Sequence, residues 1–354
     1  MPAAFPRPRD NARVLDGYGP RWSDDVGQAG WIAERLTPRE DDEYPVTIVV
    51  PAGFEAYARV LHPAETPGNG NRLVRWAEVA AWSGMPLRDD AQFHSIALPP
   101  AAPLGPPPFS GGGPRAGSLY PPDAEVLARL ARVWTSTPEN CWFCVWDGFG
   151  WGQGAVAAVS TEDGTLPEVL EEALRDPVPA EVREGPRVRL PYRNYLLYRG
   201  PAEAVVATAR VPGTWEQCAN LWWPADRAWC VASEIDLPWT YVGGPRGLVD
   251  AILADDRIEA LPAAPDDPVS RVEDWVTAWA GELADGLLAR GEASLTTSRG
   301  TVEAWLRSGE LRIEATGARD ENSSAGSSGR LSGDNLREEL LFHLTYAILD
   351  LASM

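Results

Sequence analysis

The sequence predicts an α+β protein in which helices flank a mixed, mostly antiparallel sheet, with a small α-β-β-β-α unit at the C-terminal end. Of the 354 residues, 44% are apolar and 16 are Trp, which is typical of a folded chain with a large core. The segments with strand and helix patterns do not alternate regularly enough for a doubly wound parallel sheet. A chain of this length has room for about two domains.

We expect three parts along the chain. A Pro/Arg-rich lead-in at 1–19, which we expect to be flexible, precedes a main α+β domain at 20–262. The stretch 261–268 (LPAAPDDP) concentrates proline and acidic residues, as linkers commonly do. The small C-terminal unit spans 268–354, and its Ser/Gly-rich stretch at 317–333 predicts a flexible loop.

The first half of the main domain contains short elements separated by Pro and Gly breaks. Hydrophobic periodicity predicts helices at 24–36, 73–82 and 123–133 and strands at 46–50, 54–61 and 141–146, with a helix as the alternative at 54–61. The turn Asp147-Gly148 joins the last strand to a further predicted strand at 151–159. The stretch 99–122 holds PPP, GGG and YPP and predicts a long loop, either a functional lid or a disordered segment.

The second half is predicted to return to the sheet and then to form the small unit. After a short helix at 166–175, the stretch 189–198 (RLPYRNYLLY) predicts a strand, and 202–209 predicts a helix or a strand. The later predicted elements are strands at 221–223 and 228–235, a connecting segment at 237–242, a helix that starts at Pro245 and runs through Ala254, a helix at 269–289, strands at 292–297, 302–306 and 311–315, and a closing helix at 335–351.

We expect the chain to be organised around 220–254, which holds four of the 16 Trp residues. Its first two strands flank Pro224-Ala225-Asp226-Arg227, and the Pro and Asp of this segment predict a hairpin turn. The binding candidates that we name here are Trp222, Trp223, Asp226, Trp239 and Tyr241. Rings that prove to be buried would instead serve the core, where each Trp removes a large apolar area from water.

Two features near the end of this stretch predict either a ligand site or ordinary structure. Gly243 and Gly244 precede Pro245 and a predicted helix, so their N–H groups could bind an anion at a helix start. The alternative is a loop-to-helix turn with glycines where φ must be positive. Glu234 and Asp236 lie two residues apart and could receive a metal ion or a basic group, or they could form a solvated edge.

The charge of the chain limits its partners. The sequence has 31 basic and 51 acidic residues, a net charge of −20. Phosphate backbones and anionic lipids repel such a surface, so we expect no binding to nucleic acid or membranes. A basic protein partner would suit this charge, which could also serve only for solubility. The sequence does not predict an oligomeric state.

The sequence also excludes several chemistries. It contains no Lys, which excludes Schiff-base chemistry and the lysines that hold ATP phosphates. Cys141 and Cys144 form a CxxC inside a predicted buried strand, which predicts structural thiols. The histidines His62, His94 and His343 show no metal-ligand spacing, and neither GxSxG nor GxGxxG is present. We therefore expect no catalytic residues, no metal site and no cofactor.

Four segments carry a resemblance to a known family. They are PAGFEAYARVLHP at 51–63, VRWAEVAAWSG at 74–84, TPENCWFCVWDGFG at 137–150 and LWWPADRAWCVASEIDLPWTYVGG at 221–244. Together they resemble an uncharacterised family of actinobacterial hypothetical proteins over roughly 46–261. The resemblance implies a bacterial cytosolic origin and no activity or catalytic residue, and it does not cover 268–354.

These observations lead to one main hypothesis and two alternatives. The N-terminal MPAAFPRPRD has no apolar run of signal-peptide length, so we expect a cytoplasmic protein. The main hypothesis is a soluble acidic binding protein that neutralises or scaffolds a basic protein partner, and an immunity-type role against a basic toxin is one version of it. The first alternative is a small-molecule enzyme with a site near Glu234, Asp236 and the Gly243-Gly244 helix start. The second is a purely structural component.

Overall fold

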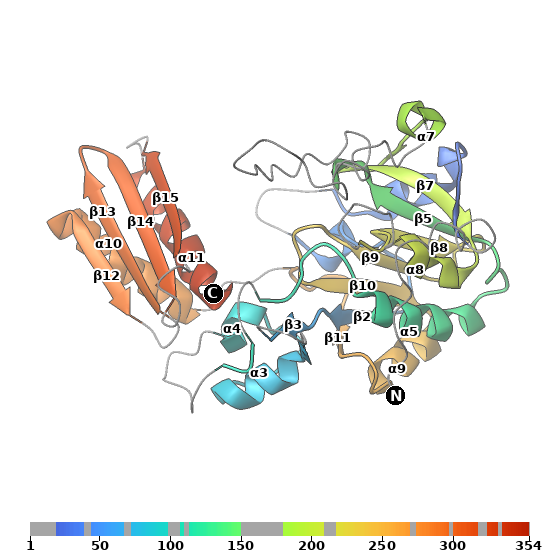
Figure 1. Ribbon diagram of the computed structural model, residues 1–354, viewed down its shortest axis with the longest axis horizontal. Helices are drawn as coiled ribbons and strands as arrows, with labels where there is room; N and C mark the ends of the chain where they lie inside the picture. The colour runs from blue at the N-terminus through green and yellow to red at the C-terminus, as the bar shows by residue number, and fades with distance from the viewer. Residues whose placement is uncertain are drawn as a thin grey trace, which may run out of the picture. The chain divides into compact units, whose positions relative to one another are not determined.

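The computed structural model describes residues 19–38, 44–66, 72–97, 107–109, 113–149, 180–208, 217–269, 274–296, 300–317, 324–331 and 335–353. They belong to two compact units (Figure 1). The first contains the described parts of Met1–His62 and Ala116–Val269, and the second those of Pro63–Arg115 and Ser270–Met354. The predicted α+β class is confirmed, since helices accompany sheets of antiparallel strands. No described helix combines the length and apolar character needed to cross a membrane.

A nine-stranded antiparallel sheet is the centre of the first unit. Its strands follow in the order β1 (Arg21–Trp22), β7 (Asn194–Gly200), β5 (Cys141–Trp146), β8 (Leu221–Pro224), β9 (Cys230–Ser233), β10 (Trp239–Gly244), β2 (Ala56–Leu61) and β11 (Ala260–Ala263), and β6 (Val188–Arg189) also pairs with β7. The predicted hairpin is confirmed as β8 and β9, with Trp222 opposite Val231. The Arg227 N–H donates to the Pro224 carbonyl at 2.8 Å and closes its turn.

Helices cover one face of this sheet (Figure 1): α5 (Pro121–Ala131), α8 (Val205–Thr208) and α9 (Arg246–Ala254). The helix predicted at 123–133 begins earlier, at Pro121, because proline suits the first turn, where its missing N–H is not needed. Leu127 of α5 and Leu248 of α9 are buried in the same core as Trp222 and Trp229. These two indole rings meet edge to face at 5.1 Å.

The other face of the sheet is contacted by α2 (Gly30–Arg35), which follows η1 (Val26–Ala29). Trp31 of α2 meets Trp223 edge to face at 6.2 Å, while Trp222 points to the opposite face because strand side chains alternate. The prediction of a strand at 46–50 is wrong. This segment contains η2 (Val46–Ile48), a single 3-10 turn, and periodicity cannot distinguish a short buried apolar turn from a strand.

The second unit contains a four-stranded antiparallel sheet with the order β12 (Glu292–Thr296), β13 (Gly300–Arg307), β14 (Glu310–Gly317) and β15 (Ser324–Arg330). The helices α10 (Asp274–Arg290) and α11 (Leu336–Ser353) pack together and against the sheet. The fourth strand, β15, lies within 317–333, so the prediction of a flexible loop is wrong for this part. Its pairing with β14 along the whole strand outweighs the low strand propensity of Gly and Ser.

The division into units differs from the predicted domain boundaries in two places. β11 and a bridge between Pro45 and Pro268 place the predicted linker at 261–268 in the first unit. The segment with β3 (Ala64–Glu65), β4 (Leu73–Val74), α3 (Trp76–Ser83) and α4 (Phe93–Ala97) belongs to the second unit, because α4 contacts α11. Such long-range contacts leave no signal in local composition.

The remaining described elements are short. They are η3 (Arg132–Trp134), η4 (Asp147–Phe149), α7 (Ala180–Glu184) and η5 (Ala202–Ala204). The stretch predicted as helix or strand at 202–209 is helical over η5 and α8, and 189–198 is a hairpin of β6 and β7 rather than one strand. The predicted strand at 151–159, the predicted helix at 166–175, the lead-in to residue 18 and most of 99–112 lie outside the described residues.

Candidate functional site

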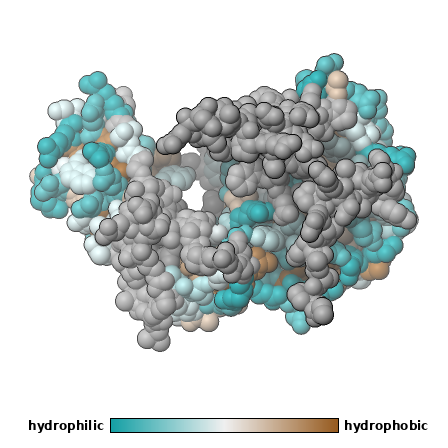
Figure 2. All heavy atoms as spheres, in the orientation of Figure 1, coloured by the Kyte–Doolittle hydropathy of each residue, from teal (hydrophilic) through white to brown (hydrophobic). Residues whose placement is uncertain are grey.

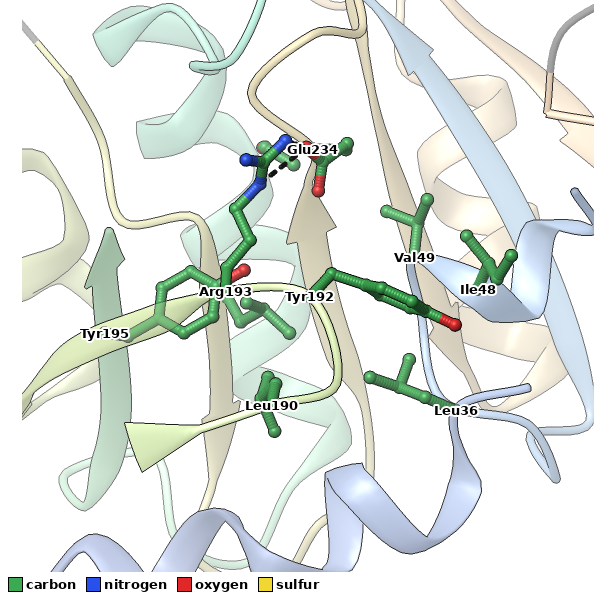
Figure 3. Close-up of a pocket in the computed structure, with 10 residues that line it drawn as sticks. Leu36, Ile48, Val49, Leu190, Tyr192, Arg193, Tyr195 and Glu234 are labelled. Carbon is green, nitrogen blue, oxygen red and sulfur yellow. Dashed lines mark hydrogen bonds and ion pairs between the residues drawn. The ribbon is translucent and has the colours of Figure 1, made fainter. Parts of the chain in front are cut away.

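A small pocket lies beside the end of β9, on the sheet face that α2 and η2 contact (Figure 3). The residues that line it are Leu36, Ile48, Val49, Leu190, Tyr192, Arg193, Tyr195, Leu221, Ser233 and Glu234. The space open to solvent inside it is about 20 Å³, which is room for about one water molecule. The pocket is therefore a small polar niche, well below the size that encloses a substrate-sized molecule.

Arg193 reaches this pocket from the turn between β6 and β7. The Leu190 N–H donates to the Arg193 carbonyl at 3.1 Å and closes the turn. The guanidinium carbon of Arg193 lies 5.2 Å from the centroid of the Trp146 ring, which is a cation–π distance. Figure 3 shows the Arg193 side chain extending toward Glu234. The turn and the indole ring together fix where this cation lies.

Glu234 and Asp236 both bind Arg193. The Arg193 Nε donates to Glu234 Oε1 at 2.9 Å, and Nη2 contacts the same oxygen. Nη2 also donates to Asp236 Oδ2 at 3.0 Å. The Glu234 side chain is 26% exposed, whereas that of Asp236 is 77% exposed. The structure thus brings these two predicted residues together, on an arginine that the sequence analysis did not single out.

The charges at this cluster leave an excess of one carboxylate. Burial lowers the pKa of Arg193, but the hydrogen bond and the charge of Glu234 outweigh it, so the pKa is raised and the guanidinium stays protonated. Its hydrogen bonds use one oxygen of each carboxylate. Glu234 Oε2 and Asp236 Oδ1 have no partner in the described part of the chain, so both can accept a further hydrogen bond.

Tyr192 lies beside this cluster at the surface. Its side chain is 40% exposed, and its hydroxyl donates to the Thr37 carbonyl at 3.3 Å. Figure 3 shows the ring extending toward Ile48 and Val49.

In Figure 2 mainly hydrophilic residues cover the described surface, and few large apolar or aromatic side chains are exposed there.

A buried hydrogen-bond chain runs from the pocket into the core. Ser233 Oγ lies 2.6 Å from Thr240 Oγ1, which lies 2.8 Å from His62 Nε2. All three side chains are buried. Ser233 and Thr240 are directly opposite each other in β9 and β10. The sequence analysis found no metal-ligand spacing at His62 and missed the two hydroxyls, which only the register of this strand pair identifies.

Gly243 and Gly244 do not form an anion site, which corrects the functional alternative proposed from the sequence. Both lie inside β10, opposite Tyr57 and Ala56 of β2. A Cβ on Gly243 would lie 2.5 Å from Phe54 Cδ2, so glycine is required here by close packing rather than by positive φ.

The start of α9 beyond these glycines is already occupied by a carboxylate of the chain. The Arg246 N–H donates to Glu55 Oε2 at 3.1 Å, and the Arg246 Nε lies 3.5 Å from Glu55 Oε1. The positive end of the helix therefore meets an internal anion.

The aromatic candidates are core residues in this structure. Their exposed fractions are 1% for Trp222, 1% for Trp223, 2% for Trp239 and 1% for Tyr241. The strands that carry them, β8 and β10, are buried on both faces, so none of these rings is available to a ligand from solvent. Burial also raises the pKa of Tyr241 to about 12.

Asp226, the remaining candidate, fastens the β8–β9 turn to the segment after η3. Its carboxylate accepts hydrogen bonds from Thr135 Oγ1 and from the N–H and Oγ of Ser136, each at 2.7 Å. Burial raises the pKa of Asp226, but these hydrogen bonds more than offset it and the pKa is lowered. The role of this carboxylate in the fold is structural.

The cysteines and His94 are held in buried surroundings. All four cysteines are free and buried. Burial raises the pKa of Cys141 to about 12 and that of Cys144 well above its ordinary value, so neither thiol forms a thiolate near neutral pH. Burial lowers the pKa of His94 in α4 to about 4. The described residues contain no group of three or more His, Cys, Asp or Glu that could hold a metal ion.

Comparison with known proteins adds no family. No protein-family model matches the chain, and neither a curated protein nor a solved structure is significantly similar to it. The functional argument therefore rests on the cluster of Arg193, Glu234 and Asp236 and on the charge of the chain.

Proposed function

We propose that this chain is an acidic binding protein whose Glu234 and Asp236 bind a basic side chain of a partner protein. The observation that carries the proposal is the pair of carboxylates that Arg193 holds side by side, with Asp236 77% exposed. A cation placed between the open oxygens of the pair would complete a network of charge-assisted hydrogen bonds.

Preorganisation supports this use of the cluster. Arg193 is fixed by its turn and by the Trp146 ring, so the two carboxylates lose little conformational freedom when a partner binds. Tyr192 and Arg193 are residue types that are enriched in the centres of protein interfaces. The net charge of −20 would attract a basic protein and accelerate its association.

The small-molecule enzyme has less support. A site that encloses a small ligand has a volume of about 300–1,000 Å³, whereas the pocket beside Glu234 offers about 20 Å³ to solvent. The carboxylates do converge, as that alternative requires, but they converge on an arginine of the chain itself. Gly243 and Gly244, on which it also relied, lie in a strand and not at an open helix start.

Two further parts of the proposal come from the sequence. We propose a cytoplasmic protein, which four free buried cysteines support, since a reducing compartment keeps thiols unpaired. We also propose that the partner is neither nucleic acid nor a membrane, because the acidic charge repels phosphate. An immunity-type role against a basic toxin is the version of this proposal in which the partner is neutralised.

Affinity capture from an actinobacterial lysate tests the proposal, since the family resemblance implies this source. The baits are the wild type, the double variant E234Q/D236N, and D24N/D250N, which removes the same charge from exposed positions of the first unit. We expect the wild type and D24N/D250N to capture the same basic protein, and E234Q/D236N to lose it. Capture of acidic proteins only, or equal capture by all three baits, would contradict the proposal.

A further inference from the structure

Arg35 and Arg227 lie against the same indole ring, although they are far apart in the sequence. Arg35 is the last residue of α2, and Arg227 belongs to the β8–β9 turn. The guanidinium carbon of each lies 5.6 Å from the centroid of the Trp31 ring, so at most twice 5.6 Å separates the two carbons. Both arginines are exposed, whereas Trp31 is 4% exposed.

The Trp31 ring is a fixed support for these two cations. It meets Phe54 edge to face at 6.3 Å and Trp223 at 6.2 Å, so the ring is held from two sides. Its Nε1 is also buried without an acceptor among the described residues. A buried donor without a partner is costly, although this atom is closed to solvent and cannot itself contact an external anion.

The two guanidinium charges have no carboxylate partner within the described part of the chain. Elsewhere in the first unit, Arg129, Arg193 and Arg257 each form an ion pair. Two neighbouring cations without a counter-charge repel each other, which is unexpected in a chain with 51 acidic residues.

The carboxylate next to Arg227 in the sequence is bound to other groups. Asp226 precedes Arg227 directly, yet its carboxylate is bound to Thr135, Ser136 and the Ala228 N–H. The adjacent acid is therefore engaged elsewhere and does not neutralise the Arg227 guanidinium. This arrangement leaves the two cations accessible to an external anion.

The backbone of Arg227 also has a strained conformation, which places its side chain against the Trp31 ring. Its φ is 58°, in the left-handed region that glycine adopts without cost and that long side chains seldom adopt. A glycine would relieve this strain, but it would remove the cation from the Trp31 ring. Strain retained at one residue of an exposed turn is typical of functional sites.

We infer that Arg35, Arg227 and Trp31 form a binding site for an oxyanion, a carboxylate or a phosphate group. Guanidinium groups bind both anions through paired N–H donors, and the shared Trp31 ring keeps two of these groups near each other. This site lies at the opposite end of β9 from Glu234, and it does not depend on the proposed basic partner.

An NMR titration of the full-length protein tests the inference. The arginine Nε–H signals are followed while inorganic phosphate or acetate is added at constant ionic strength. We expect saturable shifts of the Arg35 and Arg227 signals, assigned with the variants R35Q and R227G. Arg189 in β6, an exposed arginine of the same unit that forms no ion pair within the described residues, is the internal control and should not show a saturable shift.

The variants separate binding from folding. R227G should weaken binding at Arg35 by about tenfold or more, because one charged donor group is lost, while its thermal stability stays equal or rises. Saturation by phosphate alone, by acetate alone or by both supports the site and identifies the group that it takes. Shifts of Arg35 and Arg227 no larger than that of Arg189, or unchanged affinity in R227G, would overturn the inference. Neither result affects the proposal for Glu234 and Asp236.

Discussion

The two larger sheets of this protein differ in how many faces they bury. In the first unit, all residues of β8, β9 and β10 are buried, because helices cover one face and α2 and its neighbours cover the other. In the second unit, β12 alternates between exposed and half-buried residues, because α10 and α11 pack on one face only. A side chain on the first sheet is therefore part of a core whichever way it points, while half of the second sheet meets solvent.

The largest difference should appear when a Trp is removed from each sheet. Trp222→Ala in β8 should cost about 3–5 kcal/mol of unfolding free energy, because the ring is 1% exposed and leaves a cavity. Trp305→Ala on the open side of β13 should cost less than about 1 kcal/mol, because that ring is partly exposed. Urea unfolding measures both. Equal losses would contradict the difference in burial between the sheets.

A smaller but still large effect is expected where the backbone of the first sheet is in close contact with a side chain. Gly243→Val should cost about 2–3 kcal/mol, because its Cβ would lie 2.5 Å from Phe54 Cδ2. Gly30→Ala is the matched control, since nothing lies within 4 Å of its Cβ position. Thermal unfolding should show a large loss for the first and little change for the second, and a stable Gly243→Val variant would refute the packing described for β10.

The second unit should lose stability in acid through His94 in α4. Burial lowers the pKa of His94 to about 4 in the folded protein, below the ordinary 6.5. Protonation therefore favours the unfolded chain, and the stability from neutral His94 is complete above pH 6.5 and lost as pH falls toward 4. Between pH 7 and 5 the loss should be about 2 kcal/mol. Urea unfolding at both pH values should show this loss in the wild type and a smaller one in His94→Gln.

The smallest difference in unfolding free energy is expected when the carboxylate of one ion pair in each unit is neutralised. Glu234→Gln should cost about 1.5–2 kcal/mol, because Arg193 and Glu234 are 23% and 26% exposed and the guanidinium loses a charged acceptor. Glu314→Gln should cost less than about 0.5 kcal/mol, because Arg312 is 68% exposed and water replaces the pair. Differential scanning calorimetry of both variants checks the ranking, and a larger loss for Glu314→Gln would reverse it.

Local patterns in the sequence were sufficient for elements whose cause is local. The hairpin at 221–235 followed from the Pro and Asp of its turn, and the α+β class from the irregular order of strands and helices. β15 was missed because Ser and Gly have low strand propensity, and only the adjacent edge of β14 makes pairing favourable. The turn at Val46 was missed because an apolar run of five residues fits a strand or a buried turn equally well.

The site was harder to predict because its residues meet only through long-range pairing. Glu234 and Asp236 were identified from their spacing, but Arg193 lies 41 residues before Glu234 and reaches it through a turn inside a stretch predicted as one strand. Gly243 and Gly244 were read as a helix start, although their φ and their contacts belong to a strand. The four aromatic candidates were chosen by residue type, and burial on both faces removes them from the surface.

The most direct test of the proposed contact between the carboxylates on Arg193 and a basic partner is to measure how a variant of Asp236 binds that partner. The affinity of the captured basic partner should be measured at several salt concentrations for the wild type, Asp236→Asn and the control Asp250→Asn. The account predicts that Asp236→Asn weakens binding by about tenfold and reduces its salt dependence, while Asp250→Asn binds as the wild type does. Equal affinity and salt dependence for all three proteins would show that the carboxylates on Arg193 are not the contact.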